Sequence, residues 1–231
     1  MNKALSFLLA APLSVTLLWA GAFAVSATLG AESAYAQDAA AGEKKASMCI
    51  GCHGIPRYQS SFPEVYKVPL ISGQGAKYIA TALAEYKKGE RRHPTMRAIA
   101  GSLSDQDMAD LGAFYEKNEA SAVKPVADTG APAAPPEVAA LITKGACASC
   151  HGANFNKPID GAYPKIAGQY NDYLFAALRA YGTEGNPNVG RANPVMGAQV
   201  KQFKRSELKA IADYVSTLQG DLHTVSLHRF R

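Results

Sequence analysis

Cys147-Ala148-Ser149-Cys150-His151 is the stretch from which the fold of this chain can be predicted, and Cys49-Ile50-Gly51-Cys52-His53 repeats its pattern in the first half. Each stretch reads Cys-x-x-Cys-His, the spacing of a c-type haem attachment site. Two thiols three positions apart can each form a thioether bond with one porphyrin, and the adjacent histidine can then ligate the iron. The two stretches contain all four cysteines. The sequence therefore predicts two covalently bound haem c groups.

The cysteine pairs also have other interpretations. In an oxidising compartment, Cys49–Cys52 and Cys147–Cys150 could be disulfides. A single Cys-x-x-Cys could equally be a redox dithiol or half of a zinc site. Two copies, each followed directly by histidine, favour haem attachment over these alternatives.

The first 36 residues have the pattern of a secretory signal peptide. Lys3 gives a positive start, an apolar run extends to about Ala31, and Ala34-Tyr35-Ala36 offers the small residues that a signal peptidase reads. The mature chain would begin at Gln37 and reside in the periplasm, soluble or loosely attached to the membrane. An uncleaved anchor is the alternative, because the apolar run is long enough to span a bilayer.

Composition places the chain as a whole among ordinary globular proteins. Hydrophobic residues make up 48% and charged residues 19% of its 231 residues, which is sufficient for one or two domains. The formal net charge is +5, and residues 140–231 hold most of the excess, with 11 basic and 6 acidic residues. Such a weak positive field could orient an acidic protein partner, but it is not a signature of nucleic-acid binding.

A proline-rich segment divides the mature chain. Residues 120–136 contain four prolines and no apolar periodicity, so they cannot bury a core. We therefore expect the following parts: an N-terminal domain at 37–119, a Pro/Ala-rich linker at 120–139, a C-terminal domain at 140–220 and a basic tail at 221–231. The tail is expected to be loosely ordered. Its two histidines, His223 and His228, indicate at most an opportunistic metal site.

The two halves repeat each other in detail. Pro69-Leu70-Ile71-Ser72-Gly73-Gln74 returns as Pro164-Lys165-Ile166-Ala167-Gly168-Gln169. Apolar residues at helical spacing predict a helix over 76–88 that ends at Gly89. Before the last helix of the first half, Ser104 and Asp107 resemble a capping box. Three residues are then expected on one buried face of that helix: Met108, Leu111 and Tyr115.

An iron that only passes electrons needs a second axial ligand, and methionine is the usual choice in small c-type cytochromes. Met96 lies 44 residues after Cys52, and Met196 lies 46 residues after Cys150. Both are expected in irregular sequence ahead of the last helix of their half. Because they correspond in the repeat, we predict that each ligates one iron.

Other side chains are less suitable as sixth ligands. Met48 adjoins the attachment stretch, so it is badly placed to reach the opposite face, and Met108 is expected to pack in the core. His93 lies three residues before Met96, but its counterpart in the second half is Asn193. We therefore interpret His93 as a surface residue or as a residue that supports the site without ligating iron.

Each ligating histidine needs an acceptor for its remaining ring N–H. The carbonyls of Pro69 and Pro164 are the candidates, because proline sets a rigid turn at the same place in both halves. The alternative is that these prolines only begin a loop. The full set of predicted cofactor-binding residues, of which the histidines and methionines ligate iron, is Cys49, Cys52, His53, Met96, Cys147, Cys150, His151 and Met196.

These residues resemble the dihaem c-type cytochromes of the cytochrome c4 family. The likeness covers both halves and rests on Cys49 to Gly54, Gly73-Gln74 with Tyr78, Lys88-Gly89-Glu90-Arg91, Met96 followed by Ser102 to Asp107, Cys147 to Gly152, Gly168-Gln169 with Tyr173, and Met196. It implies an all-α fold of two tandem class I cytochrome c domains related by a pseudo-twofold axis. Each would wrap around one covalently attached haem with His/Met ligation. The chain departs from the family pattern in three places: the cap of the last helix of the second half, the long linker and the basic tail.

The resemblance implies a periplasmic electron carrier, without enzymatic activity, that connects a quinol-oxidising complex to a terminal oxidase. Two alternatives remain open. The chain could be the dihaem subunit that accepts electrons from a sulfide- or thiosulfate-oxidising dehydrogenase, which would have nearly the same residues. A dihaem peroxidase would need an exchangeable sixth position on one iron, and the paired Met96 and Met196 argue against it.

Overall fold

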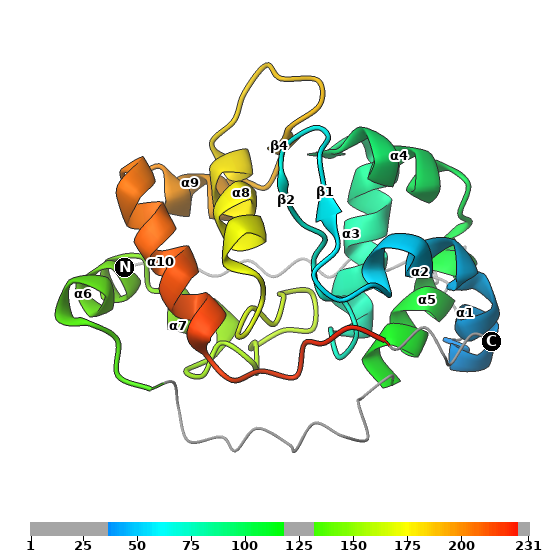
Figure 1. Ribbon diagram of the computed structural model, residues 1–231, viewed down its shortest axis with the longest axis horizontal. Helices are drawn as coiled ribbons and strands as arrows, with labels where there is room; N and C mark the ends of the chain where they lie inside the picture. Colours follow the sequence, from blue (N-terminus) through cyan, green and yellow to red (C-terminus); the bar gives the residue numbers. More distant parts are fainter. Residues whose placement is uncertain (1–36, 118–131, 226–231) are drawn as a thin grey trace, which may run out of the picture. The chain divides into compact units, whose positions relative to one another are not determined.

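The computed structural model describes residues 37–117 and 132–225 (Figure 1). All of the described residues belong to one compact unit within Tyr35–Arg231. The predictions for the signal peptide, for most of the linker and for the end of the tail concern residues outside the described ranges. Within these ranges, no helix is long and apolar enough to cross a membrane.

Helices form most of the described first half. In chain order they are α1 (Ala39–Lys45), α2 (Ser47–His53), α3 (Ala76–Lys88), α4 (Pro94–Gly101) and α5 (Asp105–Lys117). Two short strands pair with each other between α2 and α3, namely β1 (Gln59–Ser60) and β2 (Tyr66–Lys67).

The described second half has the same order of helices. They are α6 (Pro136–Lys144), α7 (Cys147–His151), α8 (Asn171–Tyr181), α9 (Pro194–Val200) and α10 (Arg205–Thr217). Strand β3 (Arg91–Arg92) of the first half pairs antiparallel with β4 (Gly190–Arg191) of the second. The structure confirms the predicted, predominantly helical fold.

Helix α3 has the predicted bounds because its apolar residues recur at helical spacing. Ile79 and Ala82 are buried on one face. Gly89 adopts a left-handed conformation with φ of 81° and ends the helix.

Helix α5 begins with the predicted capping box. The Asp107 carboxylate accepts the N–H of Ser104 at 2.8 Å, and the Ser104 hydroxyl accepts the N–H of Asp107 at 3.1 Å. The three residues expected on the buried face, Met108, Leu111 and Tyr115, are each at most 3% exposed. In the second half the N–H of Lys204 donates to the Glu207 carboxylate at 2.5 Å. Of the two bonds of the capping box, only the one from the backbone N–H of the cap residue to the carboxylate three residues later is kept.

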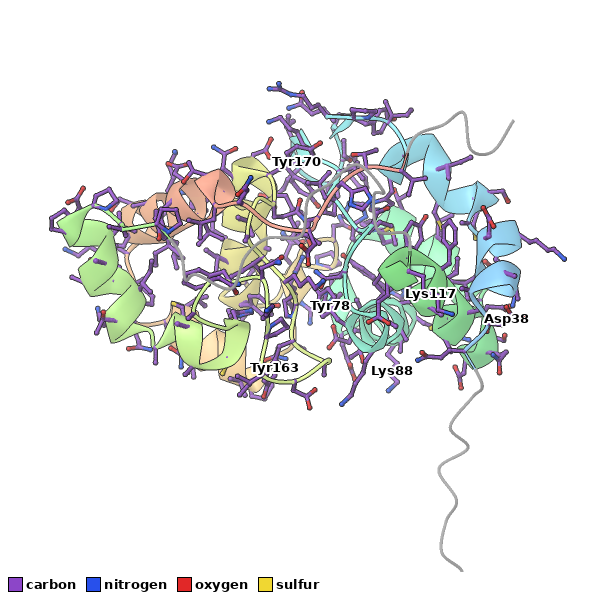
Figure 2. All side chains as sticks on the ribbon, turned by 90° about the horizontal axis from the view of Figure 1, so that it is seen from below. Asp38, Tyr78, Lys88, Lys117, Tyr163 and Tyr170 are labelled. Atoms are coloured by element: carbon purple, nitrogen blue, oxygen red, sulfur yellow. The ribbon has the colours of Figure 1, made fainter. Side chains whose placement is uncertain are left out.

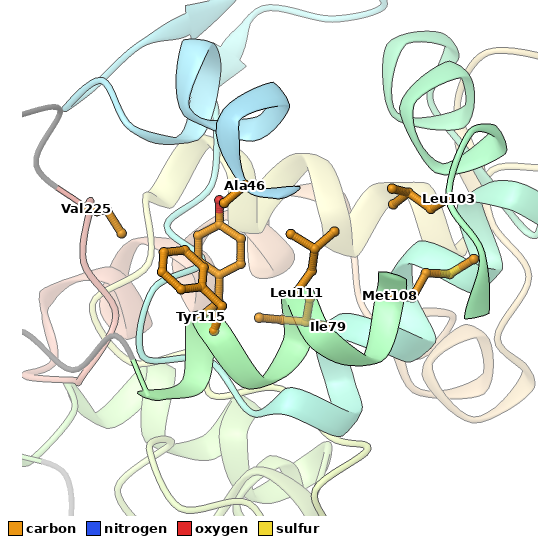
Figure 3. Packing of buried hydrophobic residues seen from close by; sticks show 8 residues of the cluster. Ala46, Ile79, Leu103, Met108, Leu111, Tyr115 and Val225 are labelled. Atoms are coloured by element: carbon orange, nitrogen blue, oxygen red, sulfur yellow. The ribbon is translucent and has the colours of Figure 1, made fainter. Parts of the chain in front are cut away.

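The core of the first half lies where α3 meets α5. Ile79 of α3 packs in one cluster with Leu111 and Tyr115 of α5. Figure 3 shows these side chains together, with the Tyr115 hydroxyl directed towards Ala46. The second half has a separate cluster on α8 and α10, which comprises Leu174, Ile211, Ala212 and Val215.

The beginning of the C-terminal tail is ordered, contrary to the prediction. Leu222 and Val225 are 7% and 5% exposed, and Val225 packs into the core cluster of the first half (Figure 3). The backbone N–H of His223 donates to the carbonyl of Ser72 at 3.1 Å. Burial of two apolar side chains fixes a segment that the sequence analysis classified by its charges alone.

A second correction concerns the linker. Helix α6 begins at Pro136, inside the segment 120–139 that was expected to be extended. Proline is tolerated at the first position of a helix because the N–H that it lacks would have no partner there. Val138 of this helix is buried. The composition of the segment did not indicate that it would bury an apolar side chain.

Ion pairs accompany the β3–β4 pairing between the halves. Lys67 binds Asp172 at 2.8 Å, Arg179 binds Glu64 at 2.6 Å, and the more exposed Lys77 binds Asp160 at 3.1 Å. Each of these pairs has one partner in the first half and one in the second.

A buried carboxylate joins α1 to α5. Asp110, 2% exposed, accepts the ammonium of Lys45 at 2.8 Å and the backbone N–H of Asp38 at 3.0 Å. Although burial opposes ionisation, these bonds keep the pKa of Asp110 below its ordinary value. The Lys45 ammonium also binds Asp107 at 2.7 Å and lowers the pKa of that carboxyl.

We expect Lys45→Ala to lower the urea midpoint of unfolding at pH 7, because it leaves the Asp110 carboxylate buried without a cation. A carboxyl with a depressed folded-state pKa stabilises the fold above its unfolded pKa and loses that effect as the pH falls. The difference between the variant and the parent should therefore begin to shrink below about pH 4, the ordinary pKa of aspartate, and vanish only below the depressed folded-state pKa values. Lys44→Ala, at an exposed position on the same helix, is the control. A constant difference across the pH range would contradict the assignment.

Val225→Ala should lower the free energy of unfolding by about 1–2 kcal/mol, because it removes two buried methyl groups from the first-half core. Chemical denaturation followed by circular dichroism measures the change. Val65→Ala is the matched control, since Val65 is 67% exposed, and it should have little effect. Equal stability of Val225→Ala and the parent would show that the tail does not contribute to the core.

Candidate haem-binding sites

The attachment stretches form helices, which brings the two thiols of each pair onto one face. Residues i and i+3 of a helix are neighbours, as are Cys49 and Cys52 in α2 and Cys147 and Cys150 in α7. All four cysteines are free thiols in the structure. Burial raises the pKa of the Cys49 and Cys147 thiols. The geometry therefore presents two thiols and the following histidine to one ligand in each half.

Each of these histidines has the predicted backbone acceptor. His53 Nδ1 lies 2.9 Å from the carbonyl oxygen of Pro69, and His151 Nδ1 lies 2.9 Å from that of Pro164. A carbonyl oxygen can only accept, so Nδ1 carries the proton and donates it. Burial lowers the pKa of both imidazoles and so favours the neutral ring. Nε2 then keeps its lone pair for a metal, as an oriented axial ligand requires.

Met96 and Met196 lie in helices α4 and α9, so the expectation of irregular sequence was wrong. In each helix a proline occupies the first turn, where its missing N–H costs nothing. The residue before that proline caps the helix. His93 Nδ1 accepts the N–H of Met96 at 3.3 Å, and Asn193 Oδ1 accepts the N–H of Met196 at 3.0 Å. The two caps fix the backbone of both methionines in the same way.

The cap gives His93 and Asn193 the same role and determines where the His93 ring carries its proton. Because Nδ1 of His93 accepts a hydrogen bond, the proton of the neutral ring is on Nε2. Burial lowers the pKa of His93, which favours this neutral form. In this arrangement neither ring nitrogen offers a free lone pair to iron. The contact supports the interpretation of His93 as a residue that supports the site.

One continuous cavity of about 630 Å³ runs through both halves. Its lining includes all eight residues predicted to bind the cofactors, Cys49, Cys52, His53, Met96, Cys147, Cys150, His151 and Met196. Met48 lies beside the first pair on the same wall, whereas Met108 is in the core and does not line the cavity. Most of the remaining wall is apolar and includes Leu70, Ile79, Leu83, Ile166, Leu174 and Leu178.

Two arginines on the wall were given no role in the site from the sequence. Arg91 and Arg191 are opposite each other in the β3–β4 pair, and both line the cavity. Arg91, 7% exposed, binds Glu85 and donates to the Tyr78 hydroxyl at 3.1 Å. Tyr78 is half-buried, and Figure 2 labels it near the middle of the view. Arg191 donates to the Tyr173 hydroxyl at 2.9 Å, and among the described residues no carboxylate pairs with it.

This arrangement fits a ligand that carries carboxylates. Burial raises the pKa of Tyr173 to about 12, so its phenol stays neutral and does not neutralise Arg191. A guanidinium in a partly buried position is stabilised by an anion, and the propionate groups of haem are anions of the right kind. A signal was present in the sequence, since Arg91 and Arg191 are related by the same offset of 100 residues as the two methionines.

The residues therefore fit two haem groups. Each half supplies a pair of thiols on one helical face, an imidazole with its Nε2 lone pair free, a thioether on a capped helix and an apolar wall. The arginines supply positive charge at the junction of the two halves. The wall is shared by both halves, so the two sites belong to one cavity.

Comparison with known proteins agrees with this chemistry. The family model for cytochrome c matches residues 137–219. Cytochrome c4 of Thiocapsa roseopersicina is 30% identical over 199 residues, which cover 78% of this chain and 93% of that protein. A thiosulfate dehydrogenase electron acceptor of Stutzerimonas stutzeri is 29% identical over 182 residues, which cover 75% of this chain and 80% of that protein.

Solved structures lead to the same fold. The structure of Acidithiobacillus ferrooxidans cytochrome c4 matches with a TM-score of 0.56 at 25% identity, over 75% of this chain and 99% of that one. The comparison confirms the prediction of class I cytochrome c folds.

Met96→Ala and Met196→Ala should each remove about half of the far-red charge-transfer band of the oxidised protein, because that band reports methionine sulfur bound to iron. Optical spectra of the two variants and the parent measure it. Met48→Ala is the control, since this exposed methionine lies within the attachment helix α2, next to Cys49, and its spectrum should equal that of the parent. An unchanged band in Met96→Ala would mean that the first haem has another sixth ligand. His93→Asn, which copies the cap of the second half, would then identify whether that ligand is His93.

Proposed function

Because the chain belongs to the cytochrome c4 family, we propose that it is an electron carrier of the periplasm that takes electrons from a respiratory donor and delivers them to a terminal oxidase. Its cofactors are two covalently bound haem c groups, which supply a one-electron Fe(II)/Fe(III) couple in each half. The donor on this proposal is a quinol-oxidising complex. The exported location rests on the signal-peptide pattern of the first 36 residues.

The continuity of the cavity wall is the observation that carries the proposal. The attachment residues and the candidate methionine of both halves line one cavity. Two redox centres that share a wall suit the passage of electrons within one molecule. The predominantly apolar lining excludes water and so favours a high reduction potential, which suits the oxidase end of a respiratory chain.

The side chains proposed as iron ligands fit an electron carrier better than an enzyme that binds its substrate to iron. His53 and His151 are held by backbone acceptors, and Met96 and Met196 are held by helix caps. Held in this way, these four side chains would supply both axial ligands of each iron and would leave no position for a substrate. A dihaem peroxidase would require one of these ligands to leave.

The second candidate is an electron acceptor for a thiosulfate-oxidising dehydrogenase. The observation that favours it is the similarity to the thiosulfate dehydrogenase electron acceptor of S. stutzeri, which spans most of both chains. The two candidates differ in the donor and share the chemistry of the cavity.

Anaerobic mixing of the oxidised holoprotein with each donor tests the two candidates. On the main proposal, a quinol-oxidising complex with quinol reduces both haems, and membranes containing a terminal oxidase then reoxidise them, as followed by the absorbance of reduced haem. Reduction by thiosulfate and its dehydrogenase, but not by the quinol-oxidising complex, would select the second candidate. Mixtures without the chain are the control. Catalytic consumption of hydrogen peroxide by the parent protein would overturn the carrier assignment.

A further inference from the structure

Gln74 and Gln169 are buried glutamines that each reach into the opposite half. Both are 4% exposed. Gln74 Nε2 donates to the carbonyl of Lys165 at 2.9 Å, and its Oε1 accepts the N–H of Lys165 at 2.9 Å. Gln169 Nε2 donates to the carbonyl of Leu70 at 2.8 Å, and its Oε1 accepts the N–H of Leu70 at 3.0 Å. The two contacts are equivalent in the repeat and run in opposite directions across the boundary.

The peptides that the glutamines bind are those that hold the candidate iron ligands. The carbonyl of Pro69, which accepts from His53 Nδ1 at 2.9 Å, and the N–H of Leu70 are the two ends of one peptide group. A continuous chain therefore runs from the His53 imidazole through this peptide to Gln169 of the other half. The equivalent chain runs from His151 through the peptide between Pro164 and Lys165 to Gln74.

The orientation of each amide is fixed by additional contacts. Gln74 Oε1 also accepts the N–H of Gly75 at 3.0 Å, and Gln169 Oε1 accepts the N–H of Tyr170 at 3.0 Å. Each Oε1 therefore accepts from two N–H groups. Because an amide nitrogen cannot accept a hydrogen bond, it is the oxygen that faces the N–H of Lys165 or Leu70 in the opposite half.

A glycine turn places each glutamine. Gly73 and Gly168, directly before Gln74 and Gln169, have positive φ values of 81° and 72°. At Gly73 a Cβ would lie 2.5 Å from the backbone oxygen of Asp221, and at Gly168 it would lie 3.0 Å from that of Leu218. Only glycine fits both the conformation and the space.

The chain of bonds has an electronic consequence with a definite sign. Resonance couples the N–H and C=O of one peptide, so an acceptor on the N–H makes the carbonyl oxygen more negative. A more negative carbonyl accepts more strongly from Nδ1–H and makes the imidazole a stronger donor to a metal. A stronger donor stabilises Fe(III) relative to Fe(II) and so lowers the reduction potential of the haem that it ligates.

We propose that Gln169 lowers the reduction potential of the haem attached to the first half, and that Gln74 lowers the potential of the haem attached to the second half. Each glutamine is a positioning residue that acts through the peptide bound to the proximal histidine. The proposal rests on the assignment of His53 and His151 as iron ligands within the proposed function. On this proposal both reduction potentials depend on the docking of the halves, because the glutamine oxygen that accepts from each peptide N–H belongs to the opposite half.

Gln169→Met and Gln74→Met test the proposal, since methionine has a similar length and no amide. The readout is the potential of each haem in the holoprotein, from a redox titration in which haem methyl NMR signals are assigned to one half. Gln169→Met should raise mainly the potential of the first-half haem, and Gln74→Met mainly that of the second-half haem. The two variants control each other, because each loosens the same boundary. Lys77→Ala removes an inter-half ion pair without touching either peptide and should leave both potentials unchanged.

Equal shifts of both haems in each methionine variant, or a shift confined to the haem of the mutated half, would overturn the proposal and leave the glutamines as structural contacts. If the methionine variants fail to fold, Gln169→Glu and Gln74→Glu supply the test, because the carboxylate keeps the acceptor oxygen and gains negative charge. The potential of the opposite haem should then fall more than that of the haem in the mutated half, and a rise would overturn the proposal. Potentials are measured without donor or oxidase, so failure of the proposed respiratory role would appear only in the mixing experiment.

Discussion

The hydrogen bonds from the Nδ1–H groups of His53 and His151 to the carbonyls of Pro69 and Pro164 are the constraint on which the other features depend. They assign the proton to Nδ1, leave Nε2 as the ligand atom and set the plane of each ring. They also connect a local motif to a distant part of the same half, because the acceptor lies 16 residues from the histidine in the first half and 13 in the second. The orientation of each histidine therefore depends on the position of the loop that carries the proline.

The boundary between the halves positions those loops. Each proline-containing peptide is bound on its other side by a glutamine from the opposite half, and the β3–β4 pair places Arg91 and Arg191 opposite each other on the same cavity wall. Three ion pairs and the tail that inserts Val225 into the first-half core add further contacts across the boundary. Buried hydrogen bonds from the two glutamines to these peptides hold the surfaces of the two halves together.

The repeat shows which features of a half can vary. Asn193 replaces His93 as the cap of the methionine helix without loss of the capping bond, because both side chains offer one acceptor at the same position. The carboxylate of Glu207 keeps one bond of the capping box that Ser104 and Asp107 form in the first half. The acceptor of each proximal histidine and the glutamine behind it are the same in both halves, as expected for groups that set the ligand geometry.

Much of the fold and of the candidate site could be predicted from sequence, because the signals are local or repeated. The cysteine spacing, the helical periodicity of α3 and the capping box of α5 each depend on residues within a few positions of one another. The prediction for the proline carbonyls was also correct, since the same turn occurs in both halves. The helices that carry Met96 and Met196 were missed, because both residues were expected in irregular sequence, although the proline two residues before each of them is favourable in the first turn of a helix.

Contacts between distant residues were decided by the tertiary structure alone. Nothing in the sequence around the tail indicates that Val225 packs into the core cluster that contains Tyr115, or that α6 begins within the proline-rich segment. The pairing of Gln74 with Lys165 and of Gln169 with Leu70 likewise joins residues more than 90 positions apart. The sequence by itself determined the two attachment sites, their histidines and the candidate methionines, because covalent spacing and repetition are written along the chain. Which peptide each glutamine polarises depends on how two folded surfaces meet, and only packing decides that.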